Sequence, residues 1–84
     1  SKTLEKEIGA TFAPASAEEL AKIKMDHGVK IQEVDKGKFR DAGIPQGLIL
    51  TNVDKTNIYT SNDVYKALEG KTDGILAEGY LPTG

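Results

Sequence analysis

The sequence predicts a single small α+β domain, in which five to six short strands form a partly open barrel or sandwich accompanied by two helices. Three observations support this prediction. The chain has 84 residues, which is enough for one domain and no more. Its 38% hydrophobic and 29% charged residues are typical of a globular domain with one core. Short apolar runs alternate with turns that contain glycine or proline, and only two longer segments have helical spacing.

The expected elements follow one another closely along the chain. Alternating or uniformly apolar runs identify the strands, and apolar residues three or four apart identify the helices. The order is strand, helix, strand, short helix, strand, edge strand, helix, strand, at residues 8–13, 16–27, 29–34, 38–42, 48–53, 58–59, 61–69 and 75–81. Pro14, which has no N–H for a ladder, is expected to end the first strand. The strand at 48–53 is apolar on both faces, as in the centre of a sheet.

Cap signals define both long helices. Ser16 and Glu19 have the spacing of a capping box, so the first helix is expected to begin there. It should end near residues 25–27, with Gly28 as the left-handed closing residue. The second helix has the same kinds of signal, a polar cap and a closing glycine, at Ser61 and Gly70.

Composition and charge exclude several classes of function. Eleven Lys and Arg against thirteen Asp and Glu give a net charge of -2, and the charges alternate in sign. The basic face that a nucleic-acid backbone requires is therefore not expected. The longest apolar run, residues 48–50, is too short to cross a membrane. The absence of cysteine excludes disulfides and thiol chemistry.

The chain also lacks the residues of a catalytic centre. A nucleophilic triad needs a general base, usually histidine. The only histidine, His27, lies where a helix is expected to end, which favours a capping or surface role. The acidic segment from Asp35 to Asp41 lacks the alternating oxygen ligands of a calcium loop. We therefore expect no catalytic residue, no metal and no cofactor, and we predict that this chain is not itself an enzyme.

Four tracts follow one another from residue 28 onward: GVKIQEV at 28–34, AGIPQGLIL at 42–50, VDKTNI at 53–58 and SNDVYKAL at 61–68. Through these tracts the sequence resembles the PDZ domains of bacterial HtrA/Deg-type serine proteases, and the match covers about two-thirds of the chain in the right order and spacing. Two positions depart from the family pattern. Its Gly-Asp pair is Gly47-Leu48 here, and its Asn-Gly turn is Lys55-Thr56, so this bend is expected to adopt another geometry.

The resemblance implies a non-catalytic module that captures the C-terminal tails of substrates or regulators by β-strand addition. Ladder hydrogen bonds would give affinity, and pockets for alternate side chains would give specificity. The implied site has a carboxylate-binding loop, a pairing strand and a helix wall: Glu7, Ile8, Gly9 and Ala10; Thr11 and Phe12; Asn62, Tyr65 and Leu68. Ile8 and Leu68 would form the pocket for the last ligand side chain.

The resemblance also implies a biological setting. Residues 1–84 would be one PDZ-like domain, a fragment of a larger serine protease whose last strand is cut short by the end of the sequence. The protein would act in protein quality control in the bacterial periplasm or cell envelope. Its partners would be C-terminal peptides of unfolded or envelope proteins and the protease domain of the parent chain, with neither nucleic acid nor membrane insertion.

Several residues of the implied site have simpler interpretations. Three of them, taken alone, are more simply core residues: Ile8, Ala10 and Phe12. Asn62, near a helix start, is commonly a local hydrogen-bonding residue. The ring of Tyr65 would occlude the groove, and Glu7 would repel a carboxylate. These last two features favour a second hypothesis, an assembly module that packs against neighbouring protomers and binds no free tail. A PDZ domain from another protease or secretion family is a third.

Overall fold

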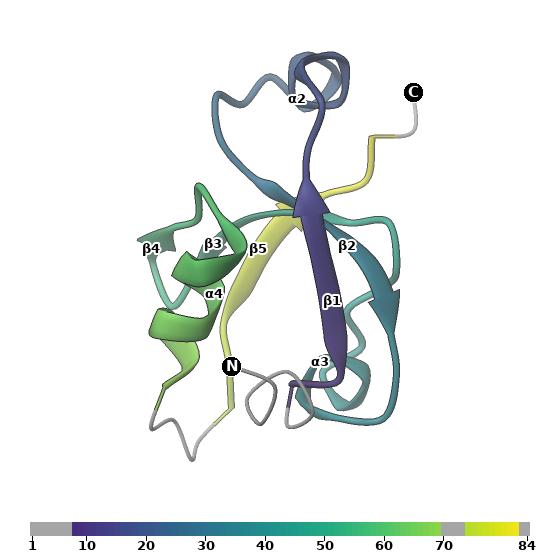
Figure 1. Ribbon diagram of the computed structural model, residues 1–84, viewed down its shortest axis with the longest axis vertical. Coiled ribbons are helices and arrows are strands. Elements are labelled where there is room, and N and C mark those ends of the chain that lie inside the picture. Colours follow the sequence, from purple (N-terminus) through teal and green to yellow (C-terminus); the bar gives the residue numbers. More distant parts are fainter. Residues whose placement is uncertain (1–7, 70–73, 83–84) are drawn as a thin grey trace.

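The computed structural model of the chain describes residues 8–69 and 74–82 (Figure 1). Its elements, in chain order, are β1 (Ala10–Pro14), α2 (Ala17–Ile23), β2 (Val29–Val34), α3 (Lys38–Asp41), β3 (Ile49–Val53), β4 (Thr56–Asn57), α4 (Ser61–Leu68) and β5 (Ala77–Tyr80). The α+β class and the order of elements expected from the sequence are confirmed. Over the described residues, five antiparallel strands form one open sheet with three helices, an arrangement consistent with a PDZ-like fold.

β3 is the central strand of the sheet. It pairs with β2 through Ile49 and Leu50, with β4 through Asn52 and Val53, and with β5 along most of its length. Four of its five residues are buried, which confirms the prediction of a strand covered on both faces. β1 pairs with β2 alone, so one side of β1 has no strand neighbour among the described residues.

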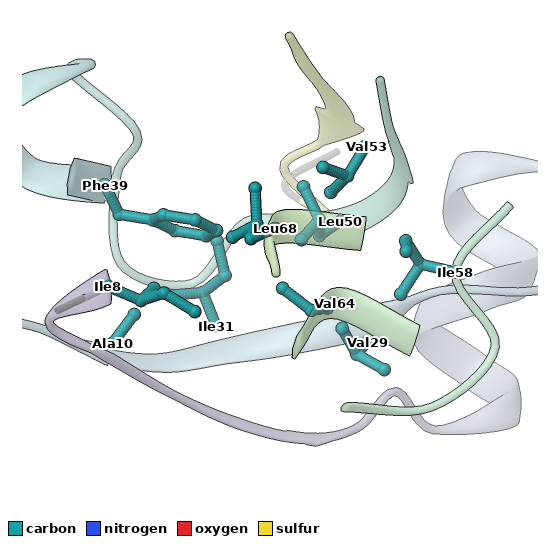
Figure 2. Close-up of a cluster of buried hydrophobic side chains, with 10 residues drawn as sticks. All are labelled: Ile8, Ala10, Val29, Ile31, Phe39, Leu50, Val53, Ile58, Val64 and Leu68. Atoms are coloured by element: carbon teal, nitrogen blue, oxygen red, sulfur yellow. The ribbon is translucent and has the colours of Figure 1, made fainter. Parts of the chain in front are cut away.

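The hydrophobic core lies between the sheet and the helices α3 and α4 (Figure 2). α3 contributes Phe39, and α4 contributes Val64 and Leu68, all of them buried. The remaining members come from outside these two helices: Ile8, Ala10, Val29, Ile31, Leu50, Val53 and Ile58. Full burial of one such aliphatic or aromatic side chain contributes about 1.5–3 kcal/mol. This cluster therefore fixes the position of α4 relative to the sheet.

α2 begins where the sequence predicts but ends earlier. The Glu19 N–H donates to Ser16 Oγ and the Ser16 N–H donates to Glu19 Oε1, both at 3.0 Å, which confirms the capping box. The helix ends after seven residues, because Lys24 adopts the left-handed conformation with φ of 59°. The prediction that Gly28 closes the helix is wrong. A Cβ on Gly28 would lie 2.7 Å from Ile49 Cγ2, so this glycine serves close packing instead.

α2 lies at one end of the molecule, and it has no fully buried residue (Figure 1). An ion pair of 2.8 Å between Glu19 Oε2 and Lys30 Nζ connects it to β2. The pKa of Glu19 is lowered from 4.5 to about 2, first by the hydrogen bond from Lys30 and then by the one from the Ser16 N–H.

The start of α4 differs from the prediction by one residue. Thr60 is the N-cap, and Ser61, predicted to be the cap, is the first helical residue. The Asp63 carboxylate accepts hydrogen bonds from the N–H groups of Tyr59, at 2.8 Å, and Thr60, at 3.0 Å. These two bonds lower the pKa of Asp63. Gly70, predicted to end this helix, lies outside the described residues.

The turn between β3 and β4 has two central residues, because Val53 pairs with Thr56 across it. They are Asp54, with φ of 48°, and Lys55, with φ of 68°. Positive φ at both central positions is the type I′ geometry, for which Asn-Gly is the favoured sequence. The prediction of another geometry centred on Lys55-Thr56 is therefore wrong: the turn lies one residue earlier and keeps the I′ geometry without a glycine.

β4 also begins earlier than the edge strand predicted at residues 58–59. The Asn52 Nδ2 group donates to Asn57 Oδ1 at 2.7 Å across the β3–β4 pair. Ile58, which follows β4, is buried in the core, and its N–H donates to the Thr51 carbonyl at 2.8 Å. Tyr59 is 60% exposed. The chain therefore passes Ile58 into the core and exposes Tyr59 immediately before α4.

Candidate functional site

The open side of β1 presents backbone hydrogen-bonding groups that can be identified from the sheet register. Phe12 lies opposite Ile31. The Ile31 N–H donates to the Leu48 carbonyl at 2.9 Å and its carbonyl accepts from the Gly47 N–H at 2.8 Å, so both groups point away from β1. In an antiparallel pair, two opposite residues that do not bond to each other both point outward. Phe12 therefore directs its N–H and carbonyl to the open edge, and Pro14, two residues later, directs only a carbonyl.

The predicted carboxylate loop precedes this strand, and Gly9 is its best-defined residue. Gly9 has φ of 71°, and its carbonyl accepts a hydrogen bond of 2.6 Å from the Asp35 N–H. A Cβ on Gly9 would collide with the backbone carbonyl of Lys36. A glycine is thus required here both by the backbone conformation and by the close approach of the turn that follows β2. Glu7, the first predicted residue of the loop, lies outside the described residues.

The two residues predicted to form the pocket for the last ligand side chain are core residues. Ile8 is 0% exposed and Leu68 is 2% exposed, and both belong to the buried cluster shown in Figure 2. Ala10, the last residue of the predicted loop, is buried with them. Their side chains are already covered by the domain itself, so a guest side chain would reach them only after the core had rearranged.

An aromatic contact joins the pairing strand and the helix wall. The rings of Phe12 and Tyr65 lie edge to face, with centroids 5.9 Å apart and planes at 68°. Phe12 also contacts the buried ring of Phe39, with centroids 5.7 Å apart. Asn62 and Thr11 are exposed and belong to neither contact. The structure therefore brings Phe12 and Tyr65 together, and the domain's own rings occupy part of the space between β1 and α4.

A mainly apolar pocket of about 240 Å³ lies beside this contact, between the end of β1 and the start of α4. Its lining comes from β1, from the first residue of β2 and from the segment that enters α4: Phe12, Ala13, Pro14, Val29, Tyr59, Thr60 and Ser61. An apolar cavity of about 150 Å³ accommodates a benzene ring. This pocket is therefore large enough for one aliphatic or aromatic side chain, and it adjoins the open edge of β1.

Sequence reasoning identified Phe12 as a site residue but missed most of the pocket. Pro14 was interpreted only as the end of a strand, and Tyr59 only as part of an edge strand. One available signal was Tyr59, an aromatic residue immediately before a helix cap and outside any apolar pattern. The pocket itself has no sequence signature, because it is formed by segments about 45 residues apart.

His27 contacts Tyr59, one of the residues that line this pocket. The two rings have centroids 4.9 Å apart and planes at 35°. The imidazole side chain is only 9% exposed, and its Nδ1 lies 2.8 Å from Asp26 Oδ1. This hydrogen bond is the main cause of the lowered pKa of Asp26. His27 is therefore neither a helix cap nor a surface residue: it is buried against Tyr59, contrary to the role that the sequence favours.

Metal and membrane sites are not apparent in the part of the chain that the structure describes. Residues 8–69 and 74–82 contain no group of three or more His, Cys, Asp or Glu arranged to hold a metal ion. No helix in these ranges is long and apolar enough to cross a bilayer.

Comparison with known proteins adds no further identification: no protein-family model, curated protein or solved structure matches the chain significantly. The resemblance to HtrA/Deg-type PDZ domains therefore stays a prediction from the residues quoted above, alongside a fold that is consistent with it.

Proposed function

We propose that the chain is a peptide-binding module that adds an extended guest segment to the open edge of β1. The observation that carries the proposal is the proximity of two features: a strand edge at Phe12 that pairs with no other strand of the described residues, and an apolar pocket lined by the same residue. An exposed strand edge supplies ladder hydrogen bonds to any extended chain, and an adjacent pocket selects among side chains.

The backbone of β1 constrains the register of the guest. Phe12 offers both a donor and an acceptor, whereas Pro14 offers an acceptor only. A guest residue opposite Phe12 can therefore exchange two hydrogen bonds, and the guest can donate but not accept beside Pro14. Because successive side chains of a strand alternate between its faces, every second guest side chain would face α4 and the pocket.

The resemblance to HtrA/Deg-type domains extends this proposal to the class of ligand. On that basis the guests are C-terminal tails of unfolded or envelope proteins, presented to a serine protease domain of the parent protein in the bacterial periplasm or envelope. The chain itself would be non-catalytic. The φ of 71° at Gly9 supports this extension, because a glycine in that conformation can turn successive N–H groups toward one anion.

The aromatic contact favours a second candidate function. Because the rings of Phe12 and Tyr65 fill part of the space that a guest strand would occupy, the same face could serve assembly with neighbouring protomers instead of tail capture. The two functions differ in their response to free peptides. Deletion of residues 1–84 from the parent protein would change its oligomer size only in the second case.

Titration of the ¹⁵N-labelled domain with acetylated hydrophobic peptides that end in a free carboxylate tests the proposal. We expect amide shifts at residues 10–14 and 59–65, and weaker binding for the same peptide with an amidated terminus. N-methylation of alternate guest amides should abolish binding, while methylation of the intervening amides should not. Shifts confined to other parts of the domain would contradict the proposal.

A pocket-filling variant provides a matched control. Ser61→Phe adds a ring at the wall of the pocket and should reduce peptide affinity. Lys66→Phe adds the same ring at an exposed position of α4 that does not line the pocket, and should leave affinity unchanged. Equal effects of the two substitutions would mean that the pocket takes no guest side chain.

A further inference from the structure

β5 forms a second open edge of the sheet. Among the described residues it pairs with β3 alone, so its other side has no strand neighbour there. The Leu76 N–H donates to Asp54 Oδ1 at 3.0 Å and the Leu76 carbonyl accepts from the Asp54 N–H at 2.7 Å, so both groups point toward β3. The Glu78 carbonyl also points there, because it accepts from a threonine hydroxyl of β3 at 3.1 Å. Since the backbone groups of a strand alternate in direction, Ala77 and Gly79 direct their N–H and carbonyl groups to the open edge.

Exposed apolar side chains gather along this edge. The described part of the chain has four large apolar side chains that are exposed, and three of them belong to β5 or adjoin it: Leu76 at 52%, Tyr80 at 53% and Leu81 at 48%. Ala77 packs against the core, so Leu76, Glu78 and Tyr80 lie together on the outer face of the sheet. A strand edge with free backbone groups and apolar side chains is a template for a further strand.

Glu78 determines which strand fits, because it is the one charged residue from position 75 to position 82. An acid directly opposite Glu78 is unfavourable. In a second copy of β5, paired antiparallel about a two-fold axis at Gly79, Glu78 stands opposite Tyr80, whose ring edge carries partial positive charge. An axis at Glu78 would place two carboxylates opposite each other, and an axis at Ala77 would place Glu78 opposite the aliphatic Leu76. β5 is therefore complementary in charge to a second β5 in the register centred on Gly79.

The backbone of β5 suits the same register. The two Gly79 residues would exchange hydrogen bonds across the axis, and Ala77 of each copy would exchange them with Leu81 of the other. The Leu81 side chain would then lie beside Ala77, which packs against the core. A Cβ on Gly79 would collide with the Ile49 carbonyl, so the centre of this edge is held closely against β3. The strand that receives the second copy is therefore already positioned.

We propose that the open edge of β5 pairs antiparallel with β5 of a second copy of this chain, about a two-fold axis at Gly79. The sheets of the two copies then form one continuous sheet. Because β5 has only four residues, the contact is smaller than the roughly 800 Å² per partner of a stable complex, so association is weak and needs a high protein concentration. The contact uses neither β1 nor the pocket, and it is therefore independent of the proposed function.

Sedimentation equilibrium and ¹⁵N NMR of the 84-residue chain, from about 10 μM to about 1 mM, test the pairing. We expect a monomer–dimer equilibrium, with amide shifts at residues 77–81 that grow with concentration. Tyr80→Asp places an acid opposite Glu78 of the other copy and should weaken dimerisation roughly fivefold, whereas Tyr80→Lys should not weaken it. Tyr59→Asp, the same change at a 60% exposed tyrosine outside β5, is the matched control and should leave dimerisation unchanged.

Single cysteines report the register, because the chain has none of its own. Opposite residues that do not bond to each other have Cα atoms about 4.5 Å apart, which is within the range of a disulfide. A mixture of the Glu78→Cys and Tyr80→Cys proteins should therefore form a mixed disulfide dimer faster than either protein forms a dimer alone. Faster dimer formation by Glu78→Cys alone would overturn the register centred on Gly79.

Other occupants of the edge give different results. A chain that stays monomeric at every concentration would overturn the proposal. Contacts of residues 77–81 with residues 1–7 of the same chain, seen as nuclear Overhauser effects independent of concentration, would overturn it as well. Peptide titration at low concentration, where the chain is monomeric, tests the proposed function separately, so either result can fail while the other stands.

Discussion

Phe12 of β1 and Tyr65 of α4 stand edge to face across the proposed binding site, with ring centroids 5.9 Å apart. The two residues belong to the opposite walls between which a guest strand would lie. In the proposed binding mode, a guest that follows β1 past Phe12 would displace the Tyr65 ring, whereas a side chain that enters the pocket beside Pro14 would not. The position of this one ring distinguishes tail capture from an assembly role.

Replacement of Tyr65 by alanine should increase peptide affinity while decreasing stability. Affinity should rise because the guest would no longer have to displace the ring. Stability should fall because the domain would lose an aromatic contact and buried apolar surface, which we expect to lower the free energy of unfolding by about 1–3 kcal/mol. Isothermal titration and urea denaturation measure the two effects. Tyr80→Ala, at a 53% exposed position of β5, should change affinity little and stability by less than about 1 kcal/mol. A loss of affinity in Tyr65→Ala would show that the ring contacts the guest.

Gly9→Ala should destabilise the domain strongly. The substitution combines a positive φ of 71° with a collision between the new Cβ and the Lys36 carbonyl, so we expect a loss of about 2–4 kcal/mol. Gly43→Ala is a matched control, because its φ of 76° is similar but a Cβ there meets nothing within 4 Å. Gly43→Ala should lower the free energy of unfolding by only about 1–2 kcal/mol, the cost of a positive φ at a residue with a Cβ. If urea denaturation showed equal losses of stability in the two variants, the collision with Lys36 would not contribute to the effect.

Lys55→Gly should stabilise the domain. Lys55 holds φ of 68° at the second central position of the type I′ turn, and glycine adopts this conformation without strain. The substitution relieves about 1–2 kcal/mol of backbone strain in the folded state. Glycine also has greater backbone entropy in the unfolded chain, which offsets part of this gain. We therefore expect the free energy of unfolding to rise by roughly 0.5–1 kcal/mol. Thermal and urea unfolding measure it. Lys66→Gly, in the last turn of α4, should instead destabilise the domain by up to about 1 kcal/mol. A loss of stability in both variants would contradict the assigned turn.

The ion pair between Glu19 and Lys30 predicts acid sensitivity in a defined range. The pKa of Glu19 is about 2 in the folded protein and 4.5 ordinarily, so the folded state binds fewer protons between these values. The contribution of Glu19 to stability is complete above pH 4.5 and is lost as the pH falls toward 2. Glu19→Gln and Lys30→Gln should each flatten the pH dependence of the free energy of unfolding there. Lys22→Gln, an exposed cation on the same helix, should keep the wild-type slope, and a wild-type slope in Glu19→Gln would contradict the assignment.

Sequence patterns predicted the structure correctly where it depends on residues that are close together in the chain. The Ser16–Glu19 capping box and the strand Val29–Val34 were predicted correctly, because their hydrogen bonds and alternation involve residues close in the chain. Gly28 was misassigned because its role depends on Ile49, which approaches it from β3. The cap of α4 was displaced by one residue because burial of Ile58 fixes where the chain turns toward the helix.

The candidate site shows the same division. Phe12 and Tyr65 were singled out by the resemblance to PDZ domains. Ile8 and Leu68, chosen in the same way, are core residues at 0% and 2% exposure. The pocket beside Pro14 and the burial of His27 under Tyr59 were not predicted. Both depend on loops that meet only when β1, β2 and the segment before α4 have assembled.

By itself, the amino-acid order determined the α+β class, the succession of strands and helices, and the absence of a thiol and of a second histidine. These follow from periodicity, capping chemistry and composition, which act over a few residues. Only the tertiary structure decided which strand edge stays open, which aromatic rings contact one another, and where the apolar pocket lies. These features depend on how distant segments share one small core, and no local pattern encodes that packing.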